Sequence, residues 1–115
     1  MFDQVFLVRQ FTPEVEVYDT ATLTLQRRLA VCGLAEPSDV ASCVKYNCLY
    51  IADTGYTDGT NIFLHRAGLS GATTKWPLND VPDCLSVTPD GSNVMVTCDE
   101  VRKLKEYTTH GAETW

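Results

Sequence analysis

The stretch "CLYIAD" at residues 48–53 constrains the fold most, because it is apolar on both faces if it forms a strand. Successive side chains of a strand point to opposite faces, so a strand with one wet face alternates apolar and polar residues. Here Leu49 and Ile51 point one way while Tyr50 and Ala52 point the other. The strand therefore needs a covering layer on each side.

The same pattern occurs twice. The segment "PSDVASCVKYNCLYIADTG" from Pro37 aligns with "PDCLSVTPDGSNVMVTCDE" from Pro82, which gives a period of 45 residues. The aligned pairs are Val40 with Leu85, Ser42 with Val87, Leu49 with Val94, Ile51 with Val96, and Asp53 with Cys98. A partial earlier copy is visible in Val5–Val8, which match the apolar strand, and Val15–Tyr18, which match the strand after it. Self-similarity at such a period is typical of repeat architectures.

One full period predicts four strands, at residues 39–44, 48–53, 61–66 and 73–78. The turn "TPDGSN" at residues 88–93 is a strong hairpin signal, since Pro89 presets the first turn dihedral and Gly91 can adopt the left-handed conformation. The equivalent turn "CVKYNC" has Asn47, which tolerates that conformation, and is the weaker of the two.

Polarity changes across the four strands. The first two are apolar on both faces, whereas the third and fourth alternate or become polar. A β-propeller gives this gradient, because its small sheets stack face to face around an axis and only the outer strands meet water. A two-sheet sandwich would leave every strand one wet face, and turn signals every ten or so residues disfavour helices. We predict an all-β, β-propeller-like meander of about ten antiparallel strands in four-stranded blades. The predicted buried residues are Leu49, Ile51, Leu85, Val87, Val94 and Val96.

The 115 residues fit about one domain and are divided by the period into a partial blade at 1–36, a full blade at 37–81 and a partial blade at 82–115. This is about two and a half blades, whereas propellers close with four to eight, roughly six in many cases. The ring in one chain is therefore incomplete. Three possibilities stay open: a piece of a longer gene product, a ring completed by several copies, or an unusual open fold.

The motif "LYIADTG", preceded by "PSDVASC" and followed by "IFLHRAG" and "LNDVPDCLSVTPDG", resembles the NHL-repeat and YVTN-type family of β-propellers. The resemblance covers most of the chain, but only one copy of the motif is good. The third copy has Cys98 where the family has Asp, so a role that depends on a repeated Asp is not carried over. The resemblance implies a rigid disc that presents loops and a face to protein partners, and sometimes to RNA.

Asp53, at the end of an inner strand, is the first candidate for a site. Asp58 and Asn61 in "TGYTDGTN" are further oxygen donors that could hold Ca²⁺ with it, but they lack the alternating ligands and bidentate Glu of a dedicated loop. The favoured interpretation is that the Asp53 carboxylate accepts hydrogen bonds from loop amides. We therefore expect no catalytic residue, no metal and no cofactor.

The two histidines, His65 and His110, have no nucleophile or carboxylate at a diagnostic spacing. His65 is expected at the surface near a blade edge, and Trp76 between blades. Five cysteines contain no Cys-x-x-Cys pair, which disfavours zinc. Cys43 and Cys48 flank four residues and can face each other across a hairpin mouth, either as a disulfide or as two buried free thiols.

The net charge of −6 disfavours a nucleic acid or an anionic membrane as partner. The clusters "RR" at residues 27–28 and "RKLK" at 102–105 are interpreted as solvated faces of outer strands. No run approaches the roughly 20 apolar residues of a spanning helix, and the acid near the start makes a poor signal peptide. We expect a cytoplasmic protein.

Two classes of function stay open. The favoured one is a non-catalytic protein-interaction or scaffold module. The alternative is part of a six-bladed propeller enzyme, similar to the metal-dependent lactonases or lyases among related propellers. We also expect the open faces of the first and last sheets, with Phe6, Val8, Met95 and Val96, to be covered. The cover would come from a second copy bound head to tail or from the remainder of the same propeller.

Overall fold

A computed structural model describes residues 4–9, 12, 14–31, 33–34, 36–54, 63–68, 73–78, 81–98 and 103–108. These residues form ten strands. The strands are β1 (Gln4–Val8), β2 (Glu14–Asp19), β3 (Leu25–Ala30), β4 (Pro37–Cys43), β5 (Cys48–Asp53), β6 (Phe63–Gly68), β7 (Thr73–Pro77), β8 (Cys84–Val87), β9 (Asn93–Cys98) and β10 (Lys103–Thr108). The described part of the chain has no helix long and apolar enough to cross a membrane.

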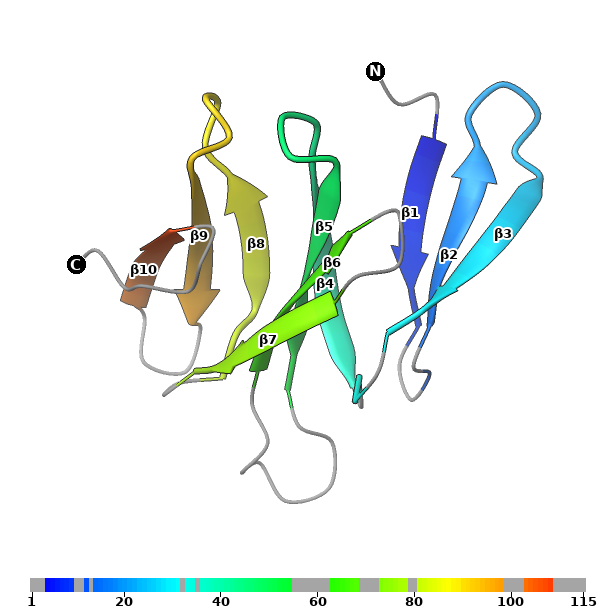
Figure 1. Ribbon diagram of the computed structural model, residues 1–115. Helices are drawn as coiled ribbons and strands as arrows, with labels where there is room; N and C mark the ends of the chain where they lie inside the picture. The colour runs from blue at the N-terminus through cyan, green and yellow to red at the C-terminus, as the bar shows by residue number, and fades with distance from the viewer. Residues whose placement is uncertain are drawn as a thin grey trace.

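The strands form three antiparallel sheets in which each strand pairs with its neighbours in sequence. The first sheet is β1-β2-β3, the middle sheet is β4-β5-β6-β7, and the last sheet is β8-β9-β10. The sheets lie side by side, with the middle one between the other two, and β4 contacts both β1 and β8 (Figure 1). The chain thus has the predicted all-β, propeller-like meander with an open ring.

The register of the strands repeats with the period read from the sequence. Val40 pairs with Ile51 in the middle sheet, and Leu85 pairs with Val96 in the last sheet. The two hairpin turns also have the predicted conformations, because Gly91 has φ 76° and Asn47 has φ 51°. A Cβ atom at Gly91 would lie 3.0 Å from the Cβ of Lys45, so the left-handed turn and the close approach both favour glycine.

Strand β5 is buried along its whole length, and each face has its own cover. On one face Leu49 and Ile51 pack with Val15 of the first sheet. On the other face Tyr50 packs with Val94 and Val96 of the last sheet. The apolar run therefore lies between two neighbouring sheets, as its sequence predicts.

The predicted burial is wrong for the inner strand of the last sheet. Leu85 and Val87 are half-buried, because β8 lies at the open edge of its sheet. Trp76, by contrast, was expected between blades, and it does pack against the cluster that joins the middle and last sheets.

The prediction that Phe6, Val8 and Val96 lie on the open outer faces is also wrong. Phe6 and Val8 pack toward the middle sheet, and Val96 is completely buried. Because side chains alternate along a strand, the outer face of the first sheet carries Val5 and Leu7 instead, which are 46% and 40% exposed.

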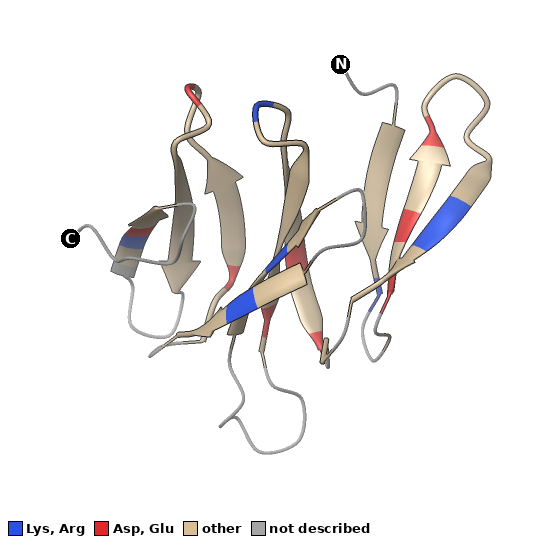
Figure 2. Cartoon of the chain, in the orientation of Figure 1, with Lys and Arg blue, Asp and Glu red and all other residues tan. Residues whose placement is uncertain are grey.

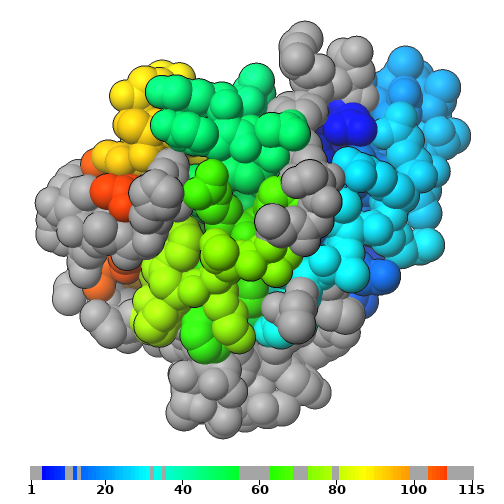
Figure 3. Space-filling view, in the orientation of Figure 1, coloured from blue at the N-terminus to red at the C-terminus, as the bar shows by residue number. Residues whose placement is uncertain are grey.

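Basic residues are scattered over the described surface. Figure 2 shows them on separate elements, including β3, β7 and the turn between β4 and β5. Arg27 and Arg28 are exposed on β3, as expected of a solvated outer strand. Figure 3 shows the three sheets as successive bands of one surface, from blue through green to yellow and orange.

Candidate functional site

Asp53 ends β5 and is buried between the first and middle sheets. One carboxylate oxygen, Oδ1, accepts a hydrogen bond of 3.0 Å from the backbone amide of Glu36, and Oδ2 lies 3.0 Å from Nε2 of His65. The Thr54 amide and hydroxyl both donate to the Glu36 carbonyl oxygen, at 3.0 and 3.1 Å. The end of β5 thus holds the segment that leads into β4. The interpretation of Asp53 as an acceptor for a loop amide is confirmed.

His65 is completely buried, so the expectation of a surface position is wrong. It lies on β6 opposite Ile51, which directs both side chains toward the first sheet. A depression of about 300 Å³ is lined by His65, Thr73, Thr74 and Lys75. However, His65 is only 1% exposed, so solvent does not reach the imidazole through it. The register that brings His65 to Asp53 could not be read from the sequence.

The two other oxygen donors considered for a cation, Asp58 and Asn61, lie outside the described residues, as does His110. Within the described ranges, no three side chains of His, Cys, Asp or Glu gather closely enough to hold a metal ion. The partners of Asp53 include the His65 imidazole and the Glu36 amide.

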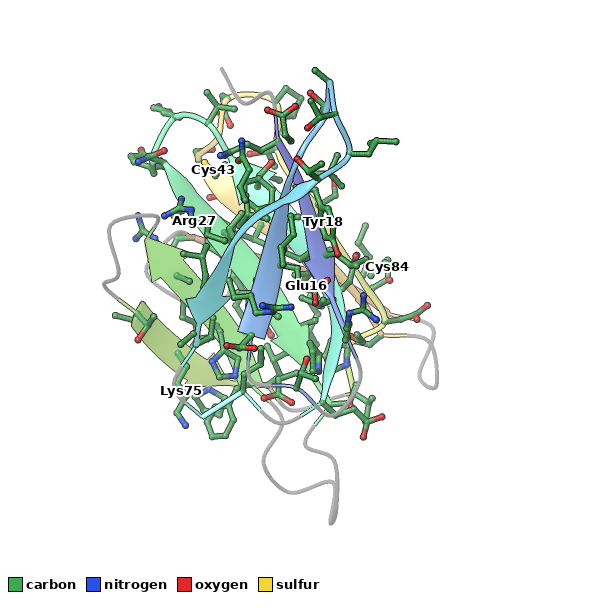
Figure 4. The ribbon with its side chains drawn as sticks, turned by 90° about the vertical axis from the view of Figure 1, so that its right-hand side faces the viewer. Glu16, Tyr18, Arg27, Cys43, Lys75 and Cys84 are labelled. Atoms are coloured by element: carbon green, nitrogen blue, oxygen red, sulfur yellow. The ribbon has the colours of Figure 1, made fainter. Side chains whose placement is uncertain are left out.

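A second polar cluster, which sequence reasoning missed, lies on the outer face of the first sheet. Arg9 Nε donates to Glu16 Oε2 at 3.0 Å, and the Tyr18 hydroxyl donates to Oε1 at 2.8 Å. Arg28 Nε lies 3.9 Å from the same carboxylate. The Tyr18 hydrogen bond and then Arg9 hold the pKa of Glu16 below its usual value. Glu16 and Tyr18 lie two positions apart on β2 (Figure 4).

The cysteines form part of the packing between the middle and last sheets. Cys43 and Cys48 pair directly across the β4–β5 ladder, and both are buried free thiols. The Cys43 thiol donates a weak hydrogen bond of 3.8 Å to the Gly91 carbonyl oxygen. The Tyr50 hydroxyl in this cluster is buried without a hydrogen-bond partner among the described residues. Burial, with the Cys48 thiol beside it, raises the pKa of Tyr50.

No family model matches the sequence, and no curated protein matches it. Solved structures do match the fold. Hydrazine synthase of Kuenenia stuttgartiensis aligns with a TM-score of 0.78 at 16% identity, over 97% of this chain and 31% of that one. A functionally unknown protein from Desulfotomaculum acetoxidans DSM 771 aligns with a TM-score of 0.65 at 15% identity, over 98% of this chain and 37% of that one.

These likenesses show the fold. At 15 to 16% identity they carry no statement about activity. The chain spans 31% and 37% of the lengths of the two matched chains, so each of them contains much more structure than the three sheets described here.

Proposed function

We propose that this chain is part of a non-catalytic, protein-binding β-propeller of the NHL type. One observation carries the proposal: Asp53, the side chain best placed for chemistry, is used to hold the fold. Its two oxygens are occupied by the Glu36 amide and by His65. The assignment to the NHL type rests on the Leu49–Asp53 motif and on Pro37 before it.

The burial of this pair argues against general acid–base catalysis. A catalytic acid or base has to come within hydrogen-bond distance, about 2.6–3.2 Å, of a proton on the substrate. Asp53 and His65 are 0% and 1% exposed, and the first sheet covers the face on which they lie. The pair resembles a catalytic dyad in composition, but a substrate has no access to it.

Protein is the favoured class of partner. A nucleic acid would reward a patch of Lys and Arg, whereas the chain has a net charge of −6 and its described basic residues are dispersed. Apolar side chains are exposed on the outer face of the first sheet, at Val5 and Leu7, and on the last sheet, at Leu104. Exposed apolar groups collected on a sheet face are typical of surfaces that bind protein.

Elemental analysis combined with thermal unfolding tests the proposal. We expect no stoichiometric calcium or zinc, and the same melting temperature with and without a chelator. Asp53→Asn should lower the melting temperature and leave the metal content unchanged. Asp90→Asn, at an exposed turn aspartate, is the control for metal content alone. Stoichiometric metal that is lost in Asp53→Asn and retained in Asp90→Asn would overturn the proposal in favour of a lactonase- or lyase-like enzyme.

A further inference from the structure

Strands β1, β5 and β9 take the same place in the repeating unit, that of the second strand of a blade. β1 and β9 run in the same direction, opposite to β8 (Figure 1). The apolar run Val5–Val8 of β1 then corresponds to Leu49–Ala52 of β5 and to Val94–Thr97 of β9. By this correspondence the described first sheet has no counterpart of the inner strand β4.

Equivalent residues on these strands differ sharply in exposure. Leu49 and Val94 are both 0% exposed, whereas Val5 at the same position is 46% exposed. Ile51 and Val96 are also 0% exposed, whereas Leu7 is 40% exposed. In the middle and last sheets a preceding sheet covers this position. The outer face of the first sheet also carries apolar residues there, Val5 and Leu7, but no preceding sheet covers it among the described residues.

The last sheet shows the complementary difference. Val8 pairs with Val15, Ala52 with Leu64, and Thr97 with Leu104, so the three partner residues are equivalent. Val15 and Leu64 are 0% exposed, and Leu104 is 44% exposed. Val15 and Leu64 each face a following sheet, which Leu104 does not have among the described residues.

We propose that the outer face of the last sheet of one copy binds the outer face of the first sheet of a second copy. Within the chain, Val15 packs with Leu49 and Ile51 at the first joint between sheets, and Leu64 packs with Val94 and Val96 at the second. In the proposed contact between copies, Leu104 of one copy packs against Val5 and Leu7 of the other, as Val15 and Leu64 pack against the next sheet within the chain. The occupant is a second copy because the two open faces match each other. Leu104 stands at the position of Val15 and Leu64, and those two residues pack against the positions that Val5 and Leu7 hold in the first sheet. This inference rests on the proposed function as a propeller segment.

The polar residues of the first sheet fit this joint. Asp53 and His65 are buried together at the first internal joint. At the equivalent position Arg9 follows Val8, and Glu16 pairs with Leu7 as His65 pairs with Ile51. The Arg9–Glu16 ion pair, with the Tyr18 hydroxyl, already satisfies the carboxylate. A covering sheet therefore buries no unpaired charge on Glu16.

Sedimentation velocity at micromolar concentrations tests the joint through two variants. Leu7→Glu places a charge on the outer face of the first sheet, and Leu104→Glu places a charge on the outer face of the last sheet. Each variant alone should be a monomer. An equimolar mixture should form a dimer. The outer face of the last sheet is unchanged in Leu7→Glu, and the outer face of the first sheet is unchanged in Leu104→Glu, so these two faces can still bind each other. Val44→Glu is the matched control and should associate as the wild type does, since Val44 is 61% exposed in the β4–β5 turn.

A folded wild-type chain that stays monomeric up to about 100 μM, a concentration at which even weak specific contacts associate, would overturn the inference. Association of Leu104→Glu alone would also overturn it, because that result indicates a contact between the first sheets of two copies. If Leu7→Glu does not melt cooperatively, Val5→Ser replaces it in the same scheme. The proposed function is tested separately, by metal content. A monomer without metal would therefore contradict the proposed contact between copies and leave the non-catalytic assignment intact.

Discussion

Asp39 Oδ2 accepts a hydrogen bond of 2.8 Å from the backbone amide of Leu85, and this bond joins the middle sheet to the last sheet. The two residues lie on β4 and β8, the inner strands of consecutive sheets. The other carboxylate oxygen accepts a bond of 2.9 Å from the Val40 amide. The Asp39 side chain thus holds the start of β4 and also connects β4 to the last sheet.

Replacing Asp39 by Ala should lower the free energy of unfolding by about 1–2 kcal/mol, because the part-buried Leu85 amide loses its acceptor. Urea unfolding measures the change. Ser38→Ala, at the exposed neighbouring position, is the control and should stay within about 0.5 kcal/mol of the wild type. Equal stabilities for the two variants would show that the Asp39 bond contributes nothing.

Replacing Asp53 by Ala should lower the free energy of unfolding by about 1–3 kcal/mol, because the Glu36 amide and the buried His65 imidazole each lose one hydrogen bond. A double-mutant cycle with His65→Ala isolates the pair, and we expect a coupling energy above about 0.5 kcal/mol. Additive losses in the cycle would mean that the two side chains contribute independently.

The sequence allowed the repeat and most strands to be predicted because their signals are local. The four strands expected between residues 39 and 78 occur as β4 to β7. The bounds of β5 are as predicted, and no strand end is shifted by more than about two residues; β6, for example, extends to Gly68. The turn at Gly91 was predictable because few residues adopt its conformation.

The polar contacts could not be predicted, because they depend on pairing between distant residues. His65 looks like a surface residue until its strand is paired with Ile51 and covered by the first sheet. Glu16 in "EVEVYD" looks like one solvated position of an alternating strand. Its near-complete burial results from Arg9 and Tyr18 closing over it.

Replacing Tyr50 by Phe should leave stability unchanged or raise it by about 1 kcal/mol, since the buried hydroxyl has no described hydrogen-bond partner. Replacement by Ala should instead cost about 3–5 kcal/mol, because it leaves a cavity between the middle and last sheets. Chemical denaturation of both variants provides the comparison. A clear loss of stability in Tyr50→Phe would indicate that the hydroxyl has a partner in solution.

Cys84 should be alkylated before the other described cysteines in the native protein. It is exposed, whereas Cys43, Cys48 and Cys98 are buried and should react only after unfolding. Desolvation, and then the nearby Asp83 and Asp39 carboxylates, raise the pKa of Cys84, so its rate should still be climbing above pH 9. Iodoacetamide labelling with peptide mapping measures the order, and Cys84→Ser should remove the fast phase. Early labelling of Cys43 or Cys48 would contradict the packing described here.

Asp90 should contribute a stabilisation that depends on pH. The Ser92 amide and hydroxyl and then the Thr88 hydroxyl lower the pKa of Asp90 from 3.8 to about 2. The contribution is therefore present above pH 3.8 and is lost as the pH falls through about 2. The difference in melting temperature between the wild type and Asp90→Asn should shrink between pH 5 and pH 2, as measured by circular dichroism. A constant difference over this range would exclude the linkage.

The strictly sequential pairing of the strands has a consequence for how the protein opens. Because the described sheets pack against their neighbours in sequence, cooperativity should pass along the chain as it does along a one-dimensional array of units. A break at either joint uncovers one face of the middle sheet, so fluctuations should begin at the terminal sheets and move inward. Amide hydrogens of β5, enclosed from both sides, then exchange with deuterium only through the rarest and largest openings.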